Sequence, residues 1–178
     1  MTPELASPEF SRRVPVDTIG AGGHAIGINA DAQECAALAR RFGWTRIERL
    51  SANARMLARA GGVDALGTLT AAIERACVAS GDPVIETVEE AFAIHFVHPS
   101  AEPASDEEIE LHEDDLDLVE FDGAAVDIGE AVAQTLALSV DPFPRSPEAA
   151  AKLRAAGVLE EGDVGNTAFA ALKGMLKE

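Results

Sequence analysis

Ile47-Glu-Arg-Leu-Ser-Ala-Asn-Ala-Arg-Met-Leu-Ala-Arg-Ala60 is the stretch on which the fold class of this chain depends. Its alanines and arginines have high helix propensity. However, apolar and polar residues alternate from Leu50 to Ala60, and only Leu57 breaks the alternation. A period of two places the apolar side chains on one face of a strand. We therefore predict a strand here, and a fold built on a sheet.

Two further runs continue this pattern along the chain. Leu66–Cys77 and Val84–Val97 also alternate, and the second run has its core positions at Val88, Phe92, Ile94 and Phe96. The connections Gly61-Gly62 and Ser80-Gly-Asp-Pro83 have the composition of tight turns. Because strands joined by short turns pair antiparallel, we predict an antiparallel sheet.

The N-terminal part predicts another pair of strands. Phe10–Ile19 places Val14 and Val16 on one face, and His24–Ala30 follows after the glycine cluster 20–23. This cluster is typical of a turn. It does not indicate a phosphate-binding loop, because it has neither the full Gly-x-Gly-x-x-Gly spacing nor a Walker lysine.

Helices are predicted between and after these strands along the chain. In Asp31–Phe42, Asp31 and Glu34 have the spacing of a capping box. Val126–Arg145 has the same spacing at Asp127 and Glu130, and Asp141-Pro142 ends it. Shorter helices are predicted over 146–157 and Asn166–Lys177. Residues 1–178 are thus predicted to form a single α+β domain, whose antiparallel sheet curls toward a barrel or half-barrel with three to four helices packed on it.

The segment 99–123 differs in kind from the rest of the chain. Eleven acidic residues and no lysine or arginine lie between Pro99 and Asp122. Such a run is typical of a flexible, solvated segment. It also carries apolar residues, so a second interpretation is that it docks on a basic partner or along its own domain. The predicted partner-binding residues are Asp114, Asp115, Leu116, Asp117, Leu118 and Phe121.

The net charge of −17, from 31 acidic and 14 basic residues, argues against RNA binding over the whole surface. A local concentration of cations is the alternative RNA-binding face; it comprises Arg40, Arg41, Arg46, Arg49, Arg55 and Arg59. The competing interpretation makes these arginines solvated partners of the excess carboxylates. Trp44, the single tryptophan, is expected in the core rather than on a base-stacking surface.

No catalytic signature is present in the sequence. It has no Gly-x-Ser-x-Gly, and no sequence neighbour of Cys77 would depress the pKa of its thiol. The two cysteines, Cys35 and Cys77, fit a reducing cytosol, and no apolar run reaches about 18 residues. We expect a cytoplasmic, non-enzymatic protein with no cofactor and no membrane partner.

Three stretches resemble one family when they are read in order. These are Ala76–Val84, Val126–Arg145 and Asn166–Lys177. They are similar to passages of the YceD family, the large ribosomal RNA accumulation proteins. The first corresponds to a Cys-x-x-Cys-Gly-x-Pro segment in which Cys77 is kept and Ser80 replaces the second cysteine. For this reason no metal site is carried over from the resemblance.

The resemblance implies an accessory protein that supports the accumulation or processing of large-subunit ribosomal RNA. We expect the acidic segment to attract a basic ribosomal protein or a ribosome-assembly factor by charge complementarity. Contact with ribosomal RNA would then be indirect. Direct RNA binding through the arginines between Arg40 and Arg59 is the alternative.

Overall fold

The computed structural model describes residues 8–20, 22–98 and 117–158. The chain divides into two compact units. The first takes in Met1–Arg75 and Ile85–Pro142, and the second takes in Ala76–Val84 and Phe143–Glu178. The helix predicted over Asn166–Lys177 lies outside the described residues, as does most of the acidic segment. The prediction of a single domain stays a prediction.

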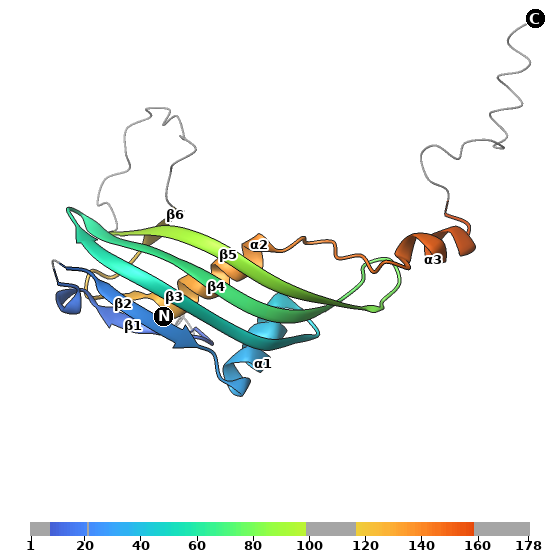
Figure 1. The fold of residues 1–178 in the computed structure, drawn as a ribbon, viewed down its shortest axis with the longest axis horizontal. Coiled ribbons are helices and arrows are strands. Elements are labelled where there is room, and N and C mark those ends of the chain that lie inside the picture. The colour runs from blue at the N-terminus through green and yellow to red at the C-terminus, as the bar shows by residue number, and fades with distance from the viewer. Residues whose placement is uncertain (1–7, 21, 99–116, 159–178) are drawn as a thin grey trace, which may run out of the picture. The chain divides into compact units, whose positions relative to one another are not determined.

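A five-stranded sheet with the order β2-β3-β4-β5-β6 is the frame of the first unit (Figure 1). Its strands are β2 (His24–Asn29), β3 (Arg46–Arg59), β4 (Gly62–Ala76), β5 (Pro83–Val97) and β6 (Asp117–Glu120). The three long strands predicted from the alternating patterns are therefore confirmed. β2, β3 and β4 pair antiparallel, but β6 runs parallel to β5. The prediction of a wholly antiparallel sheet is thus wrong at this edge.

β3 forms because burial outweighs the helix propensity of its residues. Leu50, Ala52, Ala54 and Met56 are buried on one face, while Arg55 is exposed on the other. A bulge between Ile47 and Arg49 inserts one extra residue opposite β4. The bulge shifts the phase of the alternation, so Ile47 and Leu50 both face the core.

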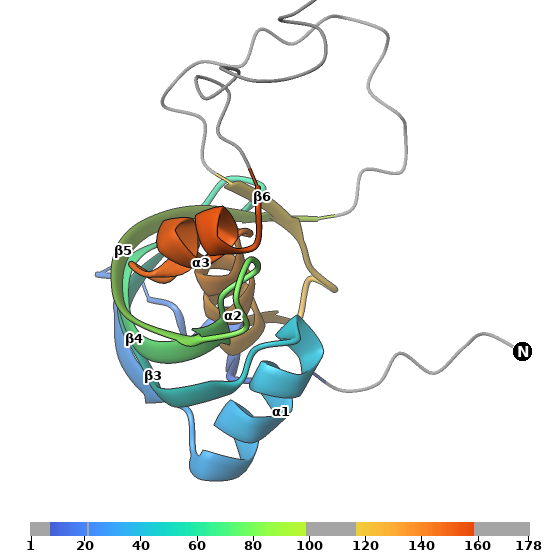
Figure 2. The same cartoon turned by 90° about the vertical axis from the view of Figure 1, so that its right-hand side faces the viewer.

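The sheet curls around α2 (Ile128–Ser139) and remains open (Figure 2). Ile128, Val132 and Leu136 are fully buried on this helix. Their spacing of four residues places them on one helix face. The α+β class is confirmed, and the open sheet has the form of a half-barrel rather than a barrel.

α1 (Ala32–Phe42) begins and ends as its sequence predicts. The Asp31 carboxylate accepts hydrogen bonds from Gln33 N and Glu34 N, and the Glu34 carboxylate accepts one from Asp31 N. Gly43 then ends the helix with φ +68°. The second predicted capping box is wrong: Asp127 caps α2, but the Glu130 carboxylate binds Arg41 instead of the cap.

The N-terminal strand has a different partner from the one predicted. β1 (Arg13–Pro15) pairs antiparallel with β7 (Ala125–Asp127) in a separate two-stranded sheet. A 3₁₀ turn over Val16–Thr18 follows Pro15 and stops the strand. β2 pairs with β3 instead, so the predicted hairpin between 10–19 and 24–30 is wrong.

The second unit contains the β4–β5 turn and α3 (Ala149–Ala155). Cys77 N donates to Asp82 O at 2.7 Å, which closes the predicted turn. Lys152 Nζ donates to both carboxylate oxygens of Asp82, at 2.6 and 2.5 Å. The helix predicted over 146–157 is shorter than expected, because the Ser146 hydroxyl contacts Asp82 and does not cap it.

Candidate functional site

A groove runs between β6 and α2 in the first unit. It consists of two adjoining cavities of about 650 and 200 Å³ that share Val119, Ala131 and Gln134. Phe96 and Phe121 contribute apolar surface to the larger cavity. We call this feature the β6–α2 groove. Among the described residues, the carboxylates that line it are Asp117, Glu120, Asp122, Asp127 and Glu130, and Arg13 is the one arginine.

Three of these five carboxylates form hydrogen bonds with other parts of the first unit. Asp127 accepts hydrogen bonds from the Ser11 hydroxyl at 2.5 Å and from Arg12 N at 2.7 Å. Asp122 accepts from the backbone N–H groups of residues 125 and 124 and from Arg13, and these bonds lower its pKa to about 2. The pKa of Glu130 is lowered mainly by its hydrogen bonds from Arg41. All three carboxylates therefore act as structural hydrogen-bond acceptors.

The other two carboxylates, those of Asp117 and Glu120, are exposed. Neither has a hydrogen bond or ion pair with another residue in the described part of the chain. Leu118 is 72% exposed and Leu138 is 84% exposed, and both line the smaller cavity. Free negative charge and exposed apolar surface therefore occur together at β6.

The predicted partner-binding residues are only partly described. Asp117 and Leu118 lie on β6, exposed as expected. Phe121 is 8% exposed and packs on His98, with ring centroids 4.7 Å apart, so it is part of the core, and its role in partner binding stays a prediction. Asp114, Asp115 and Leu116 lie outside the described residues. The flexible character predicted for 99–123 does not hold at 117–120, which form β6.

The residues predicted from the sequence to bind a partner did not include Glu120 and Leu138, which also line this site. Leu138 could have been found, because it is an apolar residue off the face of α2 that carries Ile128, Val132 and Leu136. Glu120 could not, because its place beside α2 depends on a parallel pairing with β5 that no local pattern indicates.

The six arginines of the alternative RNA-binding face lie on two elements, Arg40 and Arg41 on α1 and the other four on β3. Arg41 binds Glu9 and Glu130 across from α1. Arg46 pairs with Glu74 at 3.3 Å, and Arg59 pairs with Asp64 at 2.9 Å. The interpretation of these arginines as partners of the carboxylates is supported for these three. Arg40 and Arg46 line a separate cavity of about 460 Å³ beside α1.

Arg49 and Arg55 are the other members of this set. Both are exposed on β3, and Arg55 donates to Gly22 O at 3.0 Å. Together with Arg59 they lie on the face of the strand opposite its buried residues. The alternative RNA-binding face stays a prediction.

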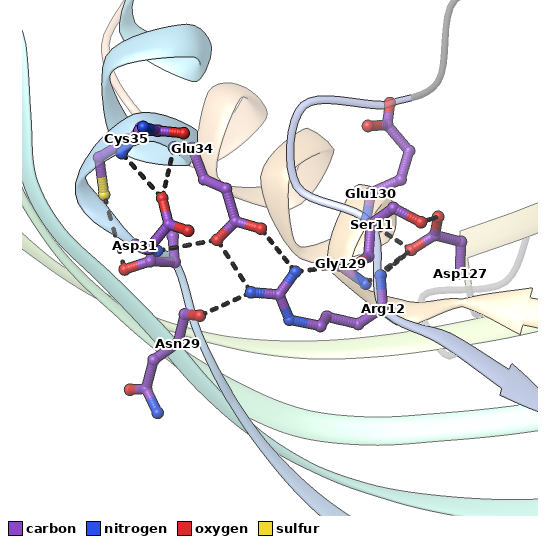
Figure 3. Close-up of polar contacts among 11 residues, drawn as sticks. Ser11, Arg12, Asn29, Asp31, Glu34, Cys35, Asp127, Gly129 and Glu130 are labelled. Carbon is purple, nitrogen blue, oxygen red and sulfur yellow. Dashed lines mark hydrogen bonds and ion pairs between the residues drawn. The ribbon is translucent and has the colours of Figure 1, made fainter.

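A polar network joins the N-terminal segment to the starts of both helices in the first unit (Figure 3). The Arg12 guanidinium donates to both carboxylate oxygens of Glu34, at 2.6 and 2.8 Å, and to Asn29 O at 2.9 Å. The pair lowers the pKa of Glu34, mainly through these hydrogen bonds. The Asp31, Glu34 and Asp127 carboxylates of this network all accept hydrogen bonds, so the network holds the N-terminal segment against both helices.

Gly129 lies inside this network, where α2 passes the N-terminal segment. A Cβ atom at this position would lie 2.5 Å from Phe10 O and 2.9 Å from Arg12 N. The close approach of the two backbones therefore requires glycine here.

Cys77 in the second unit differs from its prediction. The thiol is buried, yet hydrogen bonding from Ser80 lowers its pKa to about 6. Ser80, which replaces the second cysteine of the family segment, therefore lowers the pKa of Cys77, although no sequence neighbour was expected to do so. Cys35, by contrast, is a core residue whose pKa is raised by burial.

No group of three or more His, Cys, Asp or Glu side chains placed to hold a metal ion occurs among the described residues. His95 Nδ1 lies 2.5 Å from Asp64 Oδ1, at a distance typical of a hydrogen bond. Within the same ranges, no helix combines the length and apolarity needed to cross a membrane.

The chain was compared with protein families, curated proteins and solved structures. No curated protein and no solved structure matches it significantly. One family matches residues 65–176, and its description is "Large ribosomal RNA subunit accumulation protein YceD". The matched range takes in most of β4 and all of β5, β6 and α2, and so includes most of the β6–α2 groove. The chain therefore belongs to the YceD family.

Proposed function

We propose that this protein is a non-enzymatic accessory factor in the cytoplasm that supports the accumulation of large-subunit ribosomal RNA by binding a basic protein. The partner would be a ribosomal protein or a ribosome-assembly factor, and contact with the RNA would be indirect. The family description supports the link to ribosomal RNA. The observation that supports the binding mode is a pair of carboxylates, Asp117 and Glu120, which have no partner among the described residues and lie beside exposed leucines.

Charge and apolar surface would act at different stages of binding. A chain with net charge −17 attracts cationic surfaces over several ångströms, and this attraction raises the rate of encounter. Leu118 and Leu138 then lose contact with water, and full burial of a leucine contributes about 1.5–3 kcal/mol. The same net charge repels phosphates, which favours a protein partner over bare RNA.

The test is the double variant Asp117→Asn/Glu120→Gln, used as bait in cell lysate with and without nuclease. Recovered basic proteins should fall, and association should slow most at low salt, where charge steering is strongest. Stability should stay within about 0.5 kcal/mol of the parent, because both side chains are exposed.

Glu89→Gln/Glu90→Gln is the matched control. It removes the same charge at two exposed positions of β5. Equal losses in both double variants would mean that net charge alone governs recovery. Unchanged recovery with Asp117→Asn/Glu120→Gln would exclude this part of β6 from the contact.

Direct RNA binding is the second candidate, because Arg49, Arg55 and Arg59 share the exposed face of β3. Its test is a gel shift with single-stranded ribosomal RNA fragments over a range of salt concentrations. Phosphate contacts give a slope of about −0.7 per contact in a plot of log affinity against log salt for single strands. Arg49→Gln/Arg55→Gln should then reduce the slope by about one to two. No RNA shift in the parent protein would eliminate this candidate.

A further inference from the structure

β6 is the edge strand of the described sheet, and one side of its backbone is unpaired within the described ranges. It lies at the end of the curled sheet (Figure 2) and pairs with β5 alone, from Ile94↔Asp117 to Val97↔Glu120. Phe121 N continues the ladder by donating to Val97 O at 3.0 Å. Because backbone groups point alternately to the two sides of a strand, those of Leu118 and Glu120 point away from β5.

These outward backbone groups have no bond to another backbone group in residues 8–20, 22–98 and 117–158. Such an edge is a template for an added strand unless something covers it. The opposite edge, β2, is less suited to this role. Asn29 O there already accepts a hydrogen bond from Arg12, and β2 has no exposed large apolar side chain.

The side chains around β6 define what an added strand would carry. Side chains of a strand alternate between its two faces. On one face, an added strand would reach the smaller cavity of the β6–α2 groove, where Leu138 is exposed. Leu118 and Glu120 are two residues apart and therefore share the other face of β6. There the exposed Leu118, which also lines the edge of the smaller cavity, could contact the aliphatic part of a lysine or arginine beside Glu120.

We propose that the free edge of β6 binds an extended segment of a basic protein as an added strand, with apolar and cationic side chains alternating along that segment. This inference rests on the proposed function and specifies how the partner is recognised. Main-chain hydrogen bonds would supply part of the affinity, and the alternation would supply the selectivity.

The probe is a capped heptapeptide of alternating lysine and leucine. Its control is a peptide of the same composition in which the lysines and leucines form separate blocks. On saturation with the alternating peptide, the Leu118 and Glu120 amides should exchange at least about tenfold more slowly with solvent, as newly bonded amides do. The Val119 amide, already directed at β5, should not change.

Glu120→Pro and Glu120→Gln separate the backbone from the charge. Proline removes an N–H that points to the free edge, and its ring obstructs an incoming strand, whereas edge positions tolerate it within the protein's own sheet. We expect Glu120→Pro to weaken the alternating peptide by about tenfold or more. Glu120→Gln keeps the N–H and should weaken it by less than about threefold.

Different outcomes overturn different claims. Peptide binding without slower exchange at Leu118 and Glu120, or equal weakening by both variants, would refute strand addition and leave the acidic docking surface standing. Equal affinity for the alternating and block peptides would refute the required alternation. Failure of both peptides to bind at low salt would refute the acidic surface itself. Slowed exchange without any peptide would show that another segment of this chain occupies the edge, and would also refute the inference.

Discussion

Arg75 is the most deeply buried charged residue in the described part of the chain, and its removal should destabilise the first unit. It is 4% exposed. Its guanidinium donates two hydrogen bonds to Glu86, one of them at 3.0 Å, and a third to Asp141 O. It also lies 5.8 Å from the centre of the Trp44 ring.

The expected cost of Arg75→Ala follows from these contacts. Breaking a buried ion pair costs about 3–5 kcal/mol when the remaining charge cannot be hydrated. The Glu86 side chain is 33% exposed, so water can solvate it in the variant and the cost falls toward the lower limit. We expect a loss of about 3 kcal/mol in the free energy of unfolding, which also includes the bond to Asp141 O and the packing on Trp44.

Urea denaturation followed by tryptophan fluorescence measures this loss directly, because Trp44 is the single tryptophan and touches the altered site. Arg75→Met retains most of the packing and should cost less, about 2 kcal/mol. Arg49→Ala, at an exposed position of β3, is the control and should stay within about 0.5 kcal/mol. An Arg75→Ala variant as stable as this control would refute the reasoning.

Three further predictions concern other parts of the molecule. Glu34 has a pKa lowered below 4.5 in the folded state, so its contribution to stability is present above pH 4.5 and is lost as pH falls through the folded value; Glu34→Gln should make acid denaturation less steep below that pH, and an unchanged pH profile would contradict this. The alkylation rate of Cys77 should rise with pH around a midpoint near 6, and Ser80→Ala should move that midpoint upward; a midpoint that stays in place would exclude the hydroxyl as the cause. Gly129→Ala should lower the melting temperature by several degrees despite the better helix propensity of alanine, because its Cβ would lie 2.5 Å from Phe10 O; a stabilised variant, measured by calorimetry, would show that the two backbones separate easily.

The parts of the fold that local sequence determines were predictable. The capping box at Asp31 and Glu34 depends on residues three apart, and the structure contains it. β3 was predictable because its alternation extends over enough residues for burial to outweigh propensity. Its bulge was not, because the extra residue is defined only against the partner strand β4.

The candidate site was predictable in composition more than in geometry. Negative charge and apolar residues near 117–121 were evident from the sequence. Which side chains of the groove are available to a partner depends on contacts with residues far away in the sequence. Phe121 packs on His98, and Glu130 forms an ion pair with Arg41. β6 pairs parallel with β5, and parallel strands are not joined by a tight turn, so no turn sequence indicates this pairing.

The contacts of the N-terminal segment have a consequence for the order of folding. Ser11 and Asp127, whose side chains are hydrogen-bonded, are 116 residues apart in the chain. β3, β4 and β5 are consecutive and joined by short turns, so they close small loops and should form early. On the ribosome, β1 must wait for β7 to be synthesised before it can pair. Until then, this segment remains an unpaired strand on a nascent chain, and its docking should be the slow, final step that locks the starts of α1 and α2 together.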